Sequence, residues 1–183
     1  FKYEAYFTWL TGFFLMVIVY YSNAKSYLIN ESVMKLSASQ AITISLFTLI
    51  GSWFIYDLLC KSPLKNHKKL FAFTGFAILV ALSWFLSSVF DGRAAFIHVG
   101  ALLGTIMVGN VFFIIIPSQK ALVRAAIEGK PLDEQLGKNA GLRSLHNNYI
   151  TLPVIFIMIS NHFPSTFGTP YNWLILTGIS LAG

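Results

Sequence analysis

Long apolar runs separated by short polar segments set the pattern of this chain. Uncharged windows cover residues 5–24, 36–56, 70–90, 94–119 and 144–183. A helix needs about 20 largely apolar residues to cross the hydrocarbon core of a bilayer, so each window is long enough for at least one crossing. The last window has room for two crossings, because the polar and Pro-containing segment 163–170 divides it.

The pattern therefore predicts an all-α fold, a polytopic transmembrane helical bundle that forms a single domain. About six membrane helices are expected, at residues 4–24, 39–60, 69–90, 94–117, 144–162 and 171–183. The fourth should continue past Pro117 as a water-facing extension that Gly129 and Pro131 end, and a short surface helix should follow within the 118–143 loop. Because Phe1 is not a start residue and the last apolar run stops short, we expect a domain truncated at both ends.

The composition agrees with a membrane domain. Hydrophobic residues make up 56% of the 183 residues and charged residues 11%, whereas a soluble domain carries about 25% charge. The single Cys60 excludes an internal disulfide, a c-type heme attachment motif and a cysteine metal cluster within this segment. Asp57 and Lys61, one helical turn apart, are expected to form a surface pair.

Basic residues are distributed unequally between the two sides of the predicted bundle. Ten of the 13 Lys and Arg residues fall on the side that holds the N-terminus and the 61–69 and 118–143 loops, against Lys25, Lys35 and Arg93 on the other. Cytoplasmic loops of membrane proteins are rich in Lys and Arg, so the first side is expected to be cytoplasmic. The expected location is the bacterial inner (plasma) membrane. The net charge of +6 does not indicate nucleic acid, because the basic residues lie between membrane spans.

A polar cluster opens the fifth predicted helix. It consists of Arg143, His146, Asn147, Asn148 and Tyr149. A guanidinium for negative charge, amides for carbonyl and N–H edges, and an imidazole for proton transfer suit a purine-like or carboxylate ligand. One hypothesis assigns substrate binding to Arg143 and Asn147, and catalysis to His146, Asn148 and Tyr149. The alternative is an interfacial polar cap that belongs to the inside-positive charges and the aromatic belt.

Two histidines are expected in the other leaflet, His98 near the start of the fourth helix and His162 at the end of the fifth. Imidazoles on facing helices can ligate one iron axially, and small residues beside His98 would leave room for a flat macrocycle. The hypothesis is a heme b with His98 and His162 as metal ligands and with contacts from Gly100 and Thr105. The alternatives are helix packing, with His98 hydrogen-bonded to a neighbour and Gly100 opening a GxxxG spacing, and an interfacial His162 in water.

Four long segments resemble one protein family closely: FKYEAYFTWLTGF (1–13), WFIYDLLCKSPL (53–64), HVGALLGTIMVGNVFFIIIPSQ (98–119) and RSLHNNYITLPVIFIMISNHFP (143–164). They are similar to the membrane domain of the cytochrome c-coupled urate oxidases, also called the urate hydroxylase or urate oxidase N-terminal domain. The resemblance implies about eight membrane helices, the first of them before Phe1, and a C-terminal domain carrying a c-type heme beyond Gly183. It also implies oxidation of urate to 5-hydroxyisourate, with electrons passing to a cytochrome c or a respiratory complex.

Two other functions fit the pattern. A non-catalytic membrane scaffold of a respiratory electron-transfer complex would have its histidines satisfied by neighbouring groups. A purine transporter would have a continuous polar path near the midplane, and Thr105 and Asn110 are the only strongly polar residues deep in the fourth helix. The expected partners are the lipid bilayer, a small purine and an electron acceptor, with no nucleic acid.

Overall fold

The computed structural model describes residues 2–182, and all of their regular structure is helical, so the predicted all-α class is confirmed. The elements are α1 (Lys2–Met16), η1 (Val17–Tyr21), α2 (Ala24–Tyr27), α3 (Ala38–Lys61), η2 (Pro63–Asn66), α4 (Lys68–Val89), α5 (Gly92–Gly109), η3 (Asn110–Ile115), α6 (Ile116–Ile127), α7 (Glu134–Ser160), α8 (Pro164–Phe167) and α9 (Asn172–Ala182).

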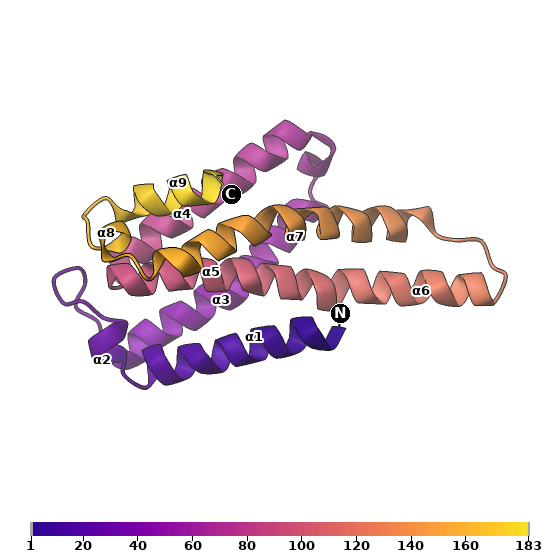
Figure 1. Cartoon of the computed structure of the whole chain (residues 1–183). Helices are drawn as coiled ribbons and strands as arrows, with labels where there is room; N and C mark the ends of the chain where they lie inside the picture. The colour runs from indigo at the N-terminus through magenta and orange to yellow at the C-terminus, as the bar shows by residue number, and fades with distance from the viewer. Residues whose placement is uncertain (1, 183) are drawn as a thin grey trace.

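Four of the described helices are long and apolar enough to cross a membrane, in keeping with a membrane protein. They are Lys2–Tyr21, Ala38–Lys61, Lys68–Val89 and Gly92–Ile127. The fifth predicted crossing corresponds to the apolar second half of α7, and the sixth to α9, a shorter apolar helix of 11 residues. Figure 1 shows α5 in the middle of the bundle, with α1 on one side, α4 and α9 on the other, and α3 crossing α5 obliquely.

The buried core lies around α5, which packs against α1, α3, α4 and α7. Phe90, between α4 and α5, and Phe96, near the start of α5, have no exposed surface. Two glycines allow close approach of neighbours: a Cβ added to Gly100 would lie 3.2 Å from the side chain of Ile157, and one added to Gly109 would overlap the indole of Trp53. The predicted small-residue contact therefore holds at Gly100. At Gly104, its GxxxG partner, an added Cβ would meet nothing within 4 Å.

The fourth predicted helix continues through Pro117 without a break. Residues 110–115 form a π-helical stretch, η3, and α6 follows directly from it with Pro117 in its first turn. Proline lacks a backbone N–H, so the carbonyl one turn before Pro117, which lies within the π-helical stretch, has no α-helical hydrogen-bond donor from that residue. As predicted, the helix ends before Gly129, whose φ of +65° lies in the left-handed region that favours glycine.

Two boundary predictions were wrong. The expected surface helix at 132–142 and the crossing at 144–162 form one continuous helix, α7. This helix starts after Asp133, whose side chain accepts hydrogen bonds from the backbone N–H groups of Gln135 and Leu136. No glycine or proline breaks the helix between the two predicted segments strongly enough to end it. The first crossing ends at Tyr21, and Ala24–Tyr27 is a separate short helix. Figure 1 shows α6 and the first half of α7 side by side, extending beyond the rest of the bundle.

Candidate functional site

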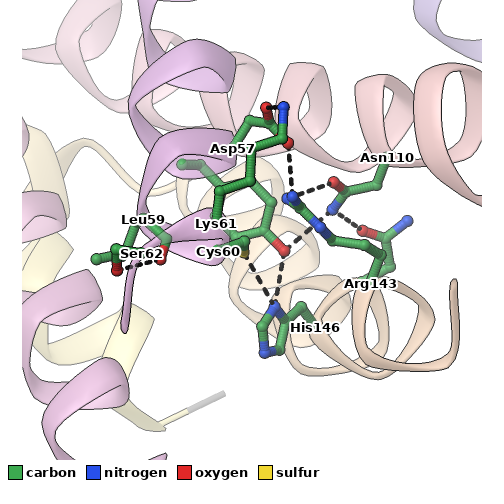
Figure 2. Close-up of polar contacts among 10 residues, drawn as sticks. Asp57, Leu59, Cys60, Lys61, Ser62, Asn110, Arg143 and His146 are labelled. Atoms are coloured by element: carbon green, nitrogen blue, oxygen red, sulfur yellow. Dashed lines mark hydrogen bonds and ion pairs between the residues drawn. The ribbon is translucent and has the colours of Figure 1, made fainter. Parts of the chain in front are cut away.

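A buried polar cluster forms where three elements meet: the last turns of α3, the start of η3, and the middle of α7. Asp57 comes from α3, Asn110 opens η3, and Arg143 and His146 come from α7 (Figure 2). The side chains of Asp57, Asn110 and Arg143 are buried. Buried polar groups are costly without partners, so their hydrogen bonds decide whether this cluster is stable.

Arg143 and Asp57 neutralise each other. Arg143 Nη2 donates to Asp57 Oδ1 at 2.5 Å, and Lys61 Nζ lies 2.6 Å from the other carboxylate oxygen. The Arg143 guanidinium also lies over the ring of Tyr56, with its central carbon 4.9 Å from the ring centroid. Asp57 is therefore not the surface residue that its spacing from Lys61 suggested. The guanidinium of Arg143 is therefore already paired with a carboxylate of the protein.

Asn110 connects the ion pair to the rest of the cluster. Its Oδ1 accepts a hydrogen bond from Arg143 Nη1 at 3.3 Å, and its Nδ2 donates to the Tyr56 hydroxyl at 3.2 Å and to Asn147 Oδ1 at 2.9 Å. Asn147 Nδ2 in turn donates to the carbonyl of Met107 at 3.0 Å. Asn110 is the first residue of the π-helical stretch, and π-helical turns are frequent at functional sites.

His146 is held on one side only. Its Nδ1 lies 2.7 Å from the Tyr56 hydroxyl and 3.9 Å from Cys60 Sγ. Its ring stacks on Phe71, with centroids 5.1 Å apart and an interplanar angle of 21°. In Figure 2 the other ring nitrogen points away from these partners, and within residues 2–182 Nε2 has no hydrogen bond.

A cavity of about 580 Å³ lies beside His146, between α3, α4, α5, α7 and α9. This volume is in the range of about 300–1,000 Å³ found for small-molecule sites, and the wall is mostly apolar, as such sites usually are. The polar residues of the wall are Ser52, Tyr56, Lys65, Lys68, His146, Tyr149 and Ser180. Tyr56 and His146 are thus shared by the cavity and the buried cluster.

The structure separates the five residues predicted on α7 into three groups. His146 and Tyr149 line the cavity. Arg143 and Asn147 lie behind its wall, where they bind Asp57 and Asn110, and Asn148 is exposed and outside the lining. Sequence reasoning missed Tyr56 and Asn110 as members of the cluster. Both residues could have been found by one feature of the sequence, because each places a polar side chain within an apolar helical segment.

His98 lies in a second polar group, on the face of α5 that meets α3 and η1. The ring is fully buried, its Nδ1 donates to the Ala94 carbonyl at 2.7 Å, and its Nε2 lies 2.6 Å from Ser45 Oγ. The Tyr21 hydroxyl lies 2.6 Å from the same Ser45 oxygen. Both ring nitrogens are therefore engaged, and the ring of Phe90 packs on it with centroids 4.8 Å apart.

These residues do not fit the predicted heme between His98 and His162. The face of α5 where a macrocycle would lie is filled: Thr105 accepts a hydrogen bond from Trp9 Nε1 at 3.1 Å, and Trp53 covers Gly109. Gly100, which was to contact the macrocycle, faces Ile157 instead. His162 is exposed beyond the end of α7. The packing alternative describes His98. Across residues 2–182, no group of three or more His, Cys, Asp or Glu side chains is placed to hold a metal ion.

The fold and the cavity define a polytopic, all-helical membrane domain with a ligand-sized chamber at a buried polar cluster. The model of the urate oxidase N-terminal family matches residues 1–183, and the chain belongs to this family. No curated protein matches the chain, and no solved structure does. The family confirms the resemblance read from the sequence.

Proposed function

We propose that this domain oxidises urate, and that urate binds in the cavity beside His146. Family membership supports the chemistry. The observation that carries the location is the state of His146 at the wall of a cavity of about 580 Å³: one ring nitrogen is hydrogen-bonded to Tyr56, and the other has no hydrogen bond among the residues that the structure describes. A convergent polar group at the end of an apolar pocket is the usual arrangement of a small-molecule site.

The cavity suits a planar anion at the end that His146 and the two lysines line. The stacked rings of Phe71 and His146 offer flat surfaces to a purine. Lys65 and Lys68 are the positively charged residues of the described lining, and neither forms an ion pair among the described residues. Their charges offset part of the cost of moving an anion out of water.

The reaction consumes one urate and one water and gives 5-hydroxyisourate, two protons and two electrons. The electrons pass to a cytochrome c or to a respiratory complex of the bacterial inner membrane, and a one-electron cytochrome is needed twice per urate. Arg143 and Asn147 act behind the wall, where they hold Asn110 and so Tyr56. Tyr149 and the lysines contact the substrate from the lining.

The test is urate consumption by the purified protein in nanodiscs with oxidised cytochrome c as acceptor. The proposal predicts two cytochromes reduced per urate lost, and at least a hundredfold loss of rate in His146→Ala, since a side chain that transfers a proton or stabilises developing charge contributes about 10²-fold or more. The control is His67→Ala, because His67 is exposed and outside the cavity lining. Wild-type protein that binds and consumes no urate would exclude the proposal.

A scaffold without catalytic activity is the second candidate, and His98 favours it. Its two nitrogens are satisfied by Ala94 and Ser45, as expected for a structural histidine. Equilibrium binding separates the two functions, because a scaffold has no reason to bind urate in a manner that depends on His146. The transporter has less support: Asn110 and Thr105 are both engaged within the protein and leave no continuous polar path among the described residues.

A further inference from the structure

We infer that His146 meets its ligand as a hydrogen-bond donor through Nε2–H, and that Tyr56 is the positioning residue that fixes this state. The ligand group against His146 is then an acceptor, such as a carbonyl or anionic oxygen. Only the naming of that ligand as urate rests on the proposed function. The inference itself follows from the donors and acceptors of the buried cluster.

Arg143 determines which atoms of the hydrogen-bond network donate and which accept. A guanidinium has no acceptor, so the Asn110 atom that it contacts at 3.3 Å must be the amide oxygen. The other end of the amide is therefore the NH₂ group, which donates to Tyr56 and to Asn147. The second amide agrees with this assignment, because the carbonyl of Met107 can only accept, and Asn147 donates to it.

The Tyr56 hydroxyl donates its hydrogen to one of its neighbours. Its oxygen already accepts from Asn110, so the O–H is free to donate. Two acceptors are near: His146 Nδ1, 2.7 Å from the hydroxyl, and the sulfur of Cys60, which lies 3.9 Å from the same nitrogen. An imidazole lone pair is a much better acceptor than a thiol sulfur, so the hydrogen goes to Nδ1. A neutral imidazole carries one N–H, and with Nδ1 accepting, that hydrogen is on Nε2.

This tautomer changes the role of His146. An Nε2 that carries hydrogen has no lone pair toward the cavity and is not a base there, contrary to the hypothesis of proton abstraction drawn from the sequence. It holds a ligand oxygen and stabilises negative charge on it, as donors aimed at an oxyanion do. Asp57 and Arg143 have an indirect part, since their ion pair orients Asn110 and thereby the Tyr56 hydroxyl.

The first test reads the tautomer directly. Protein labelled with ¹⁵N-histidine gives ring-nitrogen shifts that distinguish Nε2–H from Nδ1–H, with assignment by the His146→Gln variant. The wild type should show Nε2–H for His146. Tyr56→Phe should shift the ring to a mixture of tautomers, and Cys60→Ala should leave it unchanged. An Nδ1–H tautomer in the wild type overturns the inference without any variant.

The second test compares two amides in place of the imidazole. His146→Gln puts an NH₂ group near the place of Nε2, and His146→Asn puts one near the place of Nδ1. With His146 as donor, the Gln variant should bind urate within a few fold of the wild type, and the Asn variant roughly tenfold or more weakly, the loss expected for a hydrogen bond to a charged group. Equal loss in both overturns the inference. Tyr56→Phe should raise the KM for urate more than it lowers kcat.

Different results would exclude the oxidation of urate and the assignment of His146 as a donor. If the protein shows the Nε2–H tautomer but neither binds nor consumes urate, the proposed function is wrong and the donor assignment stands. If urate is consumed and His146→Gln is as inactive as His146→Ala, with the pH profile of kcat losing one ionisation, His146 is the base, and the inference is wrong.

Discussion

Arg143 and Asp57 are 86 positions apart in the sequence, and their side chains form an ion pair of 2.5 Å in the interior of the bundle. Their side chains are only 5% and 9% exposed. The pair joins α7 to α3 directly behind the cavity wall, so it fixes the two helices that carry His146 and Tyr56. A residue that the sequence presented as an anion receptor is thus part of the support of the site.

Removing one partner of this pair should destabilise the fold. Arg143→Ala leaves the Asp57 carboxylate buried with only Lys61 beside it, and breaking a buried pair in this way costs about 3–5 kcal/mol. The measurement is thermal or denaturant unfolding in a fixed detergent. The double variant Asp57→Leu/Arg143→Met should recover part of the loss, because no uncompensated charge remains.

The control for this prediction is Arg124→Ala, which removes an exposed ion pair with Glu128 and should change stability little. A fully stable Arg143→Ala variant with a raised KM for urate would return Arg143 to the role of a substrate-binding residue.

Filling the cavity should block the ligand without harming the fold. Gly75 lines the cavity, and a Cβ added there would lie 3.8 Å from the nearest atom, on Leu59, an ordinary van der Waals distance. Gly75→Leu should therefore place its side chain in the chamber and weaken urate binding at least tenfold. The free energy of unfolding should stay equal or rise, since replacing a glycine inside a helix by a better helix former stabilises the fold by about 0.5–1 kcal/mol.

Gly51→Leu is the matched control for the cavity. Gly51 lies in α3, has nothing within 4 Å of its added Cβ, and is outside the cavity lining. Binding and activity should be unchanged in this variant, and the gain in helix propensity should be the same. Loss of urate binding in both variants would mean that the effect of Gly75→Leu does not come from filling the cavity.

The helices could be predicted from the sequence because a bilayer demands long uncharged windows, and these are visible without tertiary information. The unbroken start of α7 could not, since most of residues 134–142 are polar or small and the long apolar run begins only farther along the helix. The cap at Asp133 starts the helix there, and Gly137 and Gly141 do not interrupt it. A hydropathy pattern thus predicts whether a segment lies in lipid or in water more reliably than it predicts where a helix begins and ends.

The candidate site could be predicted only in part, for a related reason. The polar residues of α7 stood out because they interrupt an apolar run. Which face of α3 meets them was hidden, because lipid-facing and protein-facing positions of a membrane helix are similarly apolar. Tyr56 and Asp57 therefore gave no sign of their partners. For His98, the sequence showed a buried imidazole correctly but not that Ser45 lies opposite it.

The contact between Gly109 and Trp53 gives a prediction about packing near η3. Gly109→Ala would place a methyl group inside the space of the indole, and overpacking of this kind costs about 1–3 kcal/mol. Unfolding should occur at lower temperature, and Trp fluorescence should change as the ring moves. Gly104→Ala is the control, because nothing lies within 4 Å of its added Cβ. Equal stability of the two variants would contradict the close contact of α3 with α5.

The hydrogen-bonded group around His98 gives the last prediction. Ser45→Ala leaves the fully buried His98 Nε2 without its partner, which costs about 1–3 kcal/mol. The Tyr21 hydroxyl loses the same partner and keeps its weak hydrogen bond to Met16 Sδ. Ser88→Ala is the control, because that hydroxyl donates to the Trp84 carbonyl of its own helix and has no other partner within residues 2–182. Unfolding experiments should show the loss only for Ser45→Ala. His98→Ala should lower stability and leave the visible absorption spectrum unchanged. A Soret band that disappears with His98 would show that the imidazole leaves Ser45 to bind iron, and would restore the heme ligand role.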